Sequence, residues 1–489
     1  MTTFLARRLL LAAIVLGIAG DQLLRADGMY LGFTLWVLGL VAVALAHTPF
    51  ASETDPTRPR EHLLLVGSAG AAALLLVLRD AEILWGVDFF ALIVLASLIG
   101  WRAFGRPLAA LLPRDAITGG LNAVIAAIAG GPLLFTRDAA PGDLAPENRK
   151  SMRGFAFGAV LATPLLLVVA ILLGSADPVF GAFLERVTSI FDAGLWNHLL
   201  VAAVLTWTAA GALRGALVST IGPDPLATFV TPRLSFATLA PGLIGLVILL
   251  SAWIGLQVRV MFGGAEYVAT TGGVTVAEYA RHGFFELVAV AGIVLGVLLL
   301  GDEFADREDP KEGRSFRTAG WALLALVGVM MVSAMQRLAL YIGFFGLTDE
   351  RFLAAAVLIW VALVLAWFGW TVLRRDRTRF AAGVLVLSAA WLLVLNGINP
   401  EARIVRTNLE RAGAGKSFDV EYHVKLSADA LPALLAGADQ LPPDVATQLR
   451  AALEKEWAGH HVRRPDWRSW SLPFGRVNAL LAERAAVVP

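Results

Sequence analysis

The chain has no cysteine among its 489 residues, and only 16% of these residues are charged. The absence of cysteine excludes disulfides, thiolate metal sites and cysteine nucleophiles. The low charge excludes a string of soluble domains, because ordinary globular domains carry about 25% charged residues. The formal net charge is +1, so the concentrated basic surface that nucleic-acid binding needs is missing too.

Hydrophobic residues, in contrast, make up 57% of the chain. A membrane-spanning helix needs about 20 mostly apolar residues, because the hydrocarbon core of a bilayer is about 30 Å thick. The sequence contains eleven such stretches, of which the first is the weakest because Asp21 and Gln22 interrupt it. It therefore predicts an all-α, polytopic transmembrane helix bundle. The predicted spans lie near residues 6–24, 29–47, 62–79, 82–101, 154–174, 195–213, 238–257, 283–301, 319–339, 352–373 and 380–398.

Segment 116–136 allows two interpretations, which are a twelfth span and a re-entrant or interfacial helix. Basic residues distinguish them, because cytoplasmic connections carry an excess of Lys and Arg. With eleven spans and a cytoplasmic N-terminus, the inside connections hold roughly three times as many basic residues as the outside ones. A twelfth span would reverse this excess. The distribution therefore predicts eleven spans in a bacterial cytoplasmic membrane, an extracytoplasmic C-terminus, and segment 116–136 in or on the cytoplasmic face.

The composition becomes that of a soluble protein from Asn399 onward. Leucines at helical spacing over 431–435 and a proline at 443, a residue favoured in the first helical turn, predict two helices. A third helix is expected over 474–486, and the alternation in 417–426 favours a short strand. The predicted organisation has four N-terminal spans in 1–101, a cytoplasmic loop in 102–153, a seven-helix transmembrane domain in 154–398, and a small, mainly helical extracytoplasmic domain in 399–489.

Polar residues within or at the ends of the predicted spans are the candidate functional residues, because an ionisable group in hydrocarbon costs several kcal/mol unless it is paired or hydrated. On the eleven-span topology they gather in the outer half of the bilayer, and we expect no comparable set in the inner half. Two interpretations stay open, which are helix ends that pair or snorkel to the interface, and a desolvated pocket that accepts an anionic head group. The candidate pocket residues are Asp88, Arg259, Glu278, Tyr279, Arg281, His282, Glu286, Gln336, Arg337 and Asn396.

The segment that enters the eighth span is the densest part of this set. At about 100° per residue, Tyr279, His282 and Glu286 share one helical face. Arg281 and Glu286 lie about 140° apart and do not pair within the helix. Each of them therefore needs a partner on another span or on a ligand.

Four sequence patterns resemble a bacterial family of multi-pass membrane proteins that is known only as a domain of unknown function. The resemblance covers roughly residues 150–435, and Phe345 departs from it where a second tyrosine is expected. The family has no established activity, so the resemblance implies the architecture and leaves the function open. The patterns are Tyr279-x-Arg281-x-Gly283-Phe284-x-Glu286-Leu287; Arg337-Leu338-x-Leu340-Tyr341 with Gly346-Leu347-Thr348 and Arg351; Asn399-Pro400 with Asn408-Leu409-Glu410-Arg411; and Leu426-Ser427-x-Asp429-Ala430-x-Pro432-x-Leu434.

Motifs of known chemistry are missing from the sequence. It has no phosphate-binding loop, no dinucleotide fingerprint, no H-E-x-x-H and no G-x-S-x-G. The adjacent His460 and His461 point apart on a helix, which favours a solvated pair over a metal site. We therefore predict neither a cofactor nor a metal.

Three classes of function remain after these exclusions. The missing motifs and the folded tail favour a non-enzymatic envelope protein that senses or scaffolds. A transporter or flippase-like protein would use the outer polar residues as one end of a path. A membrane enzyme for a lipid-linked anionic substrate would use Glu286 as acid or base, with Arg281 and Arg337 on the anionic group. The predicted partners are the lipid bilayer and an anionic or lipid-linked ligand at the outer leaflet, whereas protein partners stay open.

Overall fold

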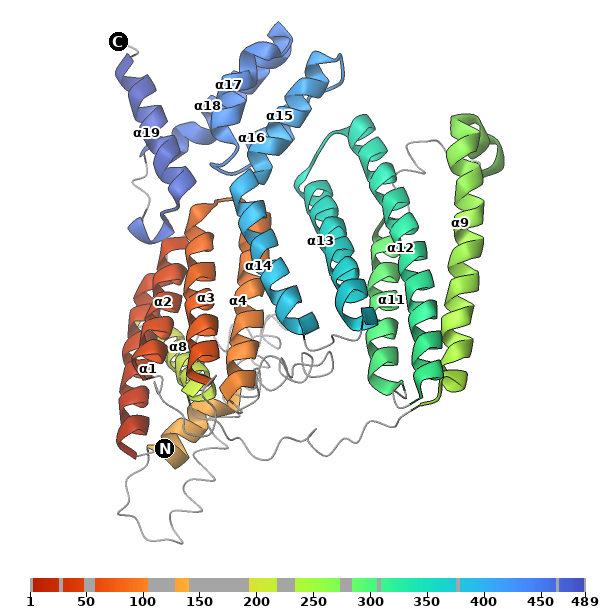
Figure 1. The fold of residues 1–489 in the computed structure, drawn as a ribbon. Coiled ribbons are helices and arrows are strands. Elements are labelled where there is room, and N and C mark those ends of the chain that lie inside the picture. The colour runs from red at the N-terminus through yellow and green to blue at the C-terminus, as the bar shows by residue number, and fades with distance from the viewer. Residues whose placement is uncertain are drawn as a thin grey trace, which may run out of the picture. The chain divides into compact units, whose positions relative to one another are not determined.

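The computed structural model of the chain consists of helices in all the ranges that it describes, apart from short turns and one isolated bridge between Leu234 and Ala305 (Figure 1). The chain divides into two compact units. Unit 1 comprises Met1–Leu78, Trp85–Pro223 and Arg464–Gly475, and unit 2 comprises Arg79–Leu84, Asp224–Arg463 and Arg476–Pro489. The described residues are 3–25, 30–47, 58–103, 128–139, 193–217, 234–272, 284–305, 309–374, 379–462 and 466–487.

Unit 1 is a bundle of long apolar helices in which α1 packs along α8. The close approach depends on Gly17, because a Cβ atom built there would lie 1.9 Å from Thr206 Oγ1 and 2.6 Å from the Ala202 carbonyl oxygen. Small residues at such crossings let two membrane helices approach backbone to backbone. The elements of this unit are α1 (Thr3–Leu23), α2 (Tyr30–His47), α3 (Arg58–Leu78), α4 (Glu82–Ala103), the π-helical turn η2 (Leu134–Asp138) and α8 (Ala193–Leu217).

Unit 2 contains a second set of spans around a core of buried aliphatic and aromatic side chains. Leu323 and Val327 of α12 and Phe368 of α13 are fully buried in this core. The long helix α12 begins where Asp309 caps it by accepting a hydrogen bond from the Lys311 backbone N–H at 2.8 Å. The spans of this unit are α9 (Phe236–Gly272), α11 (Phe284–Phe304), α12 (Pro310–Phe345), α13 (Asp349–Thr371), which continues into the 3-10 turn η3 (Val372–Arg374), and α14 (Phe380–Ile398).

The C-terminal tail is helical, as the sequence predicts, but the predicted strand over 417–426 is wrong. Asp419 accepts a hydrogen bond from the Tyr422 backbone N–H at 3.0 Å and thereby caps a short helix. This cap overrides the alternating pattern on which the strand prediction rested. The tail elements are α15 (Pro400–Gly413), α16 (Val420–Val424), α17 (Leu431–Gly437), η5 (Ala438–Gln440), α18 (Pro443–Val462), η6 (Trp467–Ser469) and α19 (Leu472–Val487).

Ten helices among the described residues are long and apolar enough to cross a membrane. They correspond to ten of the predicted spans, and the remaining one, near 154–174, lies outside the described residues. Segment 116–136 is described only from residue 128 onward, where it is helical and packs on α8 through a hydrogen bond of 2.7 Å from Trp207 Nε1 to the Ile128 carbonyl oxygen. The chain is therefore a polytopic, all-α membrane bundle, and the placement of segment 116–136 stays a prediction.

Candidate functional site

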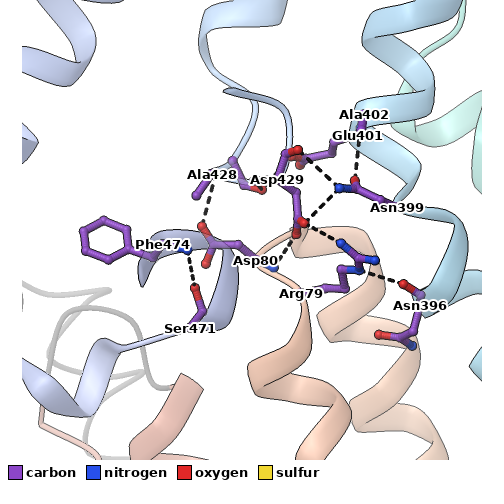
Figure 2. Close-up of polar contacts among 11 residues, drawn as sticks. Arg79, Asp80, Asn396, Asn399, Glu401, Ala402, Ala428, Asp429, Ser471 and Phe474 are labelled. Carbon is purple, nitrogen blue, oxygen red and sulfur yellow. Dashed lines mark hydrogen bonds and ion pairs between the residues drawn. The ribbon is translucent and has the colours of Figure 1, made fainter. Parts of the chain in front are cut away.

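A cluster of polar side chains in unit 2 joins the C-terminal helices to the ends of the spans. We define this joint cluster as Arg79, Asp80, Asn399, Glu401, Ser427 and Asp429. Figure 2 shows Asp429 at its centre. One Asp429 carboxylate oxygen lies 2.9 Å from Arg79 Nη1, and the other accepts the Asp80 backbone N–H at 2.7 Å. The Asp429 side chain is only 2% exposed. The hydrogen bonds from these partners compensate for the hydration that its carboxylate loses on burial.

The backbone around Asn399 fixes the angle at which α15 leaves α14. Asn399 is the one non-glycine residue with positive φ in the described ranges, at 55°, a left-handed conformation that asparagine tolerates well. Its side chain caps α15 by accepting the Ala402 backbone N–H at 3.0 Å, and Pro400 occupies the first helical turn. The Asn399 Nδ2 group also donates to Asp429 Oδ1 at 3.1 Å. One residue therefore caps the helix and binds the central carboxylate.

Glu401 is the residue of the joint cluster whose pKa is shifted most from its ordinary value. It is buried, and it accepts a hydrogen bond of 2.5 Å from Ser427 Oγ. Burial raises the pKa of Glu401 to about 8, and the nearby charges of Asp349, Asp429 and Asp80 act in the same direction. Glu401 is therefore mainly a neutral carboxylic acid at pH 7, near the carboxylates of Asp429, which pairs with Arg79, and of Asp80, which accepts the Ala428 backbone N–H.

Asn408 attaches α15 to the turn between α12 and α13. Its side-chain oxygen accepts the Leu347 backbone N–H at 2.8 Å, and its Nδ2 group donates to the Leu347 carbonyl oxygen at 2.7 Å. The second Nδ2 hydrogen points to His423 Nε2 at 2.9 Å, so this nitrogen must be the acceptor. His423 Nδ1 then carries the proton and donates to the Asp419 carbonyl oxygen at 2.6 Å. Burial lowers the pKa of His423, in agreement with a neutral ring.

Two further contacts hold the tail to the same turn. Tyr422 donates through its hydroxyl to Asp349 Oδ2 at 3.1 Å, and its hydroxyl oxygen accepts the Asp349 backbone N–H at 3.0 Å. Arg411 donates to the Phe344 carbonyl oxygen at 2.9 Å, at the C-terminal end of α12. The glycine that ends α12 permits this packing, because Gly346 has φ of 86° and a Cβ atom there would lie 2.6 Å from Asn408 Oδ1.

The structure brings one residue of the predicted pocket to the joint cluster. The buried Asn396 accepts a hydrogen bond of 2.6 Å from Arg79 Nε through its backbone oxygen. Arg337 is buried in α12, with its guanidinium 5.8 Å from the centre of the Trp253 ring. Asp88 is buried in α4, a helix that lies mostly in unit 1.

The other members of the predicted pocket lie elsewhere. Glu286 at the start of α11 and Gln336 in α12 have exposed side chains. Arg259 lies in α9 in a stretch whose side chains are not described, and Glu278, Tyr279, Arg281 and His282 lie outside the described residues. The convergence of Asp88, Arg281, Glu286 and Arg337 in one pocket therefore stays a prediction.

Sequence reasoning missed most of the joint cluster, because its charges flank the apolar stretches and resemble ordinary solvated loop residues. The available signals were the helix start at Asn399-Pro400 and the family pattern that contains Ser427 and Asp429. Asp429 follows Arg79 by 350 positions, and no local pattern pairs residues so far apart. Within the described ranges no group of three His, Asp or Glu side chains is placed to hold a metal ion.

The expectation that the other ends of the spans hold no comparable polar set is wrong. In unit 1 the fully buried Arg102 of α4 lies 2.5 Å from the Glu61 carboxylate of α3. The buried Arg214 of α8 lies 2.7 Å from the Asp138 carboxylate. Both arginines lie at helix ends, where burial cannot be recognised from hydropathy.

The fold and its candidate spans define a multi-pass membrane protein that resides in a lipid bilayer. The chain belongs to the family described as a domain of unknown function (DUF4153), whose sequence model matches residues 66–437. This range includes the α12–α13 turn and the joint cluster. Neither a curated protein nor a solved structure matches the chain.

Proposed function

We propose that the protein senses or scaffolds in the envelope of a bacterium, with its C-terminal helices outside the cytoplasmic membrane and coupled to its spans. The observation that carries this proposal is the pair of the partly buried Arg79 and the buried Asp429, because it joins the tail to the α3–α4 turn without a flexible linker. Removing one partner of a fully buried pair costs about 3–5 kcal/mol, since the other charge stays buried and unpaired, and this is the upper limit for a pair whose arginine is 16% exposed. The pair therefore attaches the tail firmly to this turn.

The tail is attached at three places in unit 2. Asp429 holds the α3–α4 turn, Asn408 and Tyr422 hold the α12–α13 turn, and Asn399 is continuous with α14. Domains that act independently are usually joined by exposed linkers with few crossing contacts. A tail fixed at several span ends instead suits a protein that transmits a binding event at α15–α18 to the membrane helices.

The division into compact units supports the same proposal. Residues Arg464–Gly475 of the tail belong to unit 1, whereas the tail on either side of them belongs to unit 2. In unit 1, Arg468 donates to the Gln22 carbonyl oxygen at the end of α1. This tail segment is therefore held to α1 within unit 1.

Complementation of a strain that lacks the gene tests this proposal. Growth under envelope stress would be compared for the wild type, Asp429→Ala and the matched control Asp439→Ala. Asp439 is an exposed tail carboxylate whose partner, Arg450, is exposed too. We expect Asp429→Ala to reach the membrane and fail to complement, while Asp439→Ala complements fully.

The variant Glu286→Gln separates the proposal from its rivals in the same assay. A sensor or scaffold should tolerate this change, because Glu286 is exposed on α11 and lies outside the joint cluster. Loss of complementation by Glu286→Gln at normal abundance, with Asp429→Ala still active, would instead favour a membrane enzyme.

A further inference from the structure

Two arginines lie together at the C-terminal end of α12 without an acidic partner among the described residues. Arg351 donates to the Gly346 carbonyl oxygen and stacks on the Tyr341 ring, with its guanidinium carbon 4.2 Å from the ring centre. Arg411 donates only to backbone oxygens, at 2.9 Å for Phe344 and 3.3 Å for Gly343. Unlike Arg79, these two side chains contact no carboxylate in the described part of the chain.

The acidic residues of the same turn, Asp349 and Glu350, are not ion-paired with these two guanidinium groups, and Asp349 accepts a hydrogen bond from Tyr422 instead. The end of a helix carries about half a negative charge, which balances only a part of two guanidinium groups. Burial lowers the pKa of Arg411, and the charge of Arg351 lowers it further. The mutual repulsion that this implies is relieved by an anion that contacts both side chains.

The turn lies where two candidate spans end, at Phe345 and Asp349. Phe344 and Phe345 are 48% and 55% exposed beside Tyr341. Exposed aromatic rings at the end of a span are typical of the depth of lipid head groups. The anion that reaches these arginines most readily is therefore one held at the membrane surface.

A groove between α12 and α13 lies farther along the same two helices, away from the arginines. It has a volume of about 510 Å³, and the residues that line it are almost all apolar, with Met335 and Leu358 nearest the turn. Arg351 precedes Ala362, a groove residue, by eleven positions, or about three helical turns, so both lie on one face of α13. Leu358, the groove residue of α13 nearest the turn, lies about 14 Å along the helix from Asp349. This is close to half the thickness of a bilayer core, about 15 Å, so only the far end of an acyl chain would reach the groove.

We propose that this place binds a phospholipid with a net negative charge. Its phosphate would lie on Arg351 and Arg411, which offer the paired N–H donors that suit phosphate oxygens. One acyl chain would run along α12 and α13, so that its end enters the groove. Tyr341 positions the Arg351 side chain. The ligand is of the anionic class that the sequence analysis predicts, but the arginines that would bind it are different ones. This proposal does not depend on the proposed sensing function.

Lipid binding to the purified full-length chain tests the site. The protein would be reconstituted with phosphatidylglycerol or phosphatidylcholine, both with palmitoyl and oleoyl chains, and retained lipid would be counted by native mass spectrometry. The test variant is Arg351→Gln/Arg411→Gln, and the matched control is Arg403→Gln/Arg406→Gln, which removes two exposed charges of α15. We expect at least a tenfold loss of phosphatidylglycerol in the test variant and no loss in the control.

Further arms make each outcome decisive. Equal loss in both double variants, or equal retention of phosphatidylcholine by the wild type, would overturn the site. Displacement of the lipid by millimolar inorganic phosphate would show that free phosphate is the ligand and overturn the lipid assignment. If the test variant fails to fold, Arg411→Lys is used instead. It keeps the positive charge but loses the paired N–H donors of the guanidinium group, and we expect it to bind phosphatidylglycerol severalfold more weakly than the wild type.

The groove is tested separately by Gly328→Leu. A Cβ atom at Gly328 meets no atom within 4 Å, so the larger side chain enters the groove without a backbone clash. We expect the variant to lose the preference of the wild type for long-chain over dihexanoyl phosphatidylglycerol. An unchanged preference would overturn the assignment of the acyl chain to the groove.

Discussion

Units 1 and 2 use buried charge in different ways. In unit 1 each buried cation meets its carboxylate between neighbouring elements, as Arg102 does with Glu61 and Arg214 with Asp138. In the joint cluster of unit 2, the Arg79–Asp429 pair lies beside two further acids, Asp80 and Glu401, and its members come from distant parts of the chain. Local pairs lock helices together, whereas the joint cluster has more acid than base and holds one acid, Glu401, in its neutral form.

The largest effect should come from removing the centre of the joint cluster. Asp429→Ala leaves the partly buried Arg79 without its carboxylate and the Asp80 backbone N–H without its acceptor. We expect the free energy of unfolding to fall by up to about 3–5 kcal/mol, the cost of breaking a fully buried pair. Thermal or denaturant unfolding in detergent measures it. Asp439→Ala, the exposed control, should change it by less than about 0.5 kcal/mol. Equal effects of the two substitutions would show that the joint cluster contributes no more to the free energy of unfolding than an exposed ion pair does.

A substitution in unit 1 tests how strongly the stability of that unit depends on close helix packing. Gly17→Ala places a methyl group into Thr206 and the backbone of α8, and overpacking of this kind costs about 1–3 kcal/mol. The same unfolding assay applies. Gly67→Ala in α3 is the control, because a Cβ atom there meets nothing within 4 Å. A Gly17→Ala protein as stable as the control would contradict the close α1–α8 contact.

The acid excess of unit 2 predicts a dependence of stability on pH. The pKa of Glu401 is raised to about 8 in the folded protein from its ordinary value of 4.5. The folded state therefore holds its proton more tightly, and the contribution of Glu401 to stability falls as the pH rises from about 4.5 to about 8. Each unit of pKa difference corresponds to about 1.4 kcal/mol.

Glu401→Gln removes this titration while keeping an acceptor for Ser427. Melting temperatures between pH 5 and pH 8 should fall less steeply for the variant than for the wild type, so the variant gains relative stability at pH 8. Parallel curves for the two proteins would show that Glu401 does not titrate in this range.

The least perturbing experiment uses the absence of cysteine. Single variants Lys416→Cys in the tail and Lys311→Cys at the start of α12 replace exposed side chains. On the predicted topology, a membrane-impermeant maleimide labels the first in intact cells and labels the second only after lysis. The reverse pattern would place the tail in the cytosol and overturn the proposed envelope function.

The spans were predictable because an apolar stretch of fixed length is a local property of the sequence. The joint cluster was not, since the pairing of Arg79 with Asp429 depends on tertiary structure alone. Helix ends could be predicted only in part. Pro443 correctly indicated α18, whereas the cap at Asp419 turned a predicted strand into a helix.

The distance in sequence between Arg79 and Asp429 also has a consequence for biogenesis. The ribosome adds about 5–20 residues per second, so tens of seconds separate the synthesis of the two residues, which lie 350 positions apart. During that interval the α3–α4 turn must stay in contact with water or the lipid surface, because its guanidinium has not yet met Asp429. Pairing of the newly made tail with this turn is therefore a late step of membrane assembly.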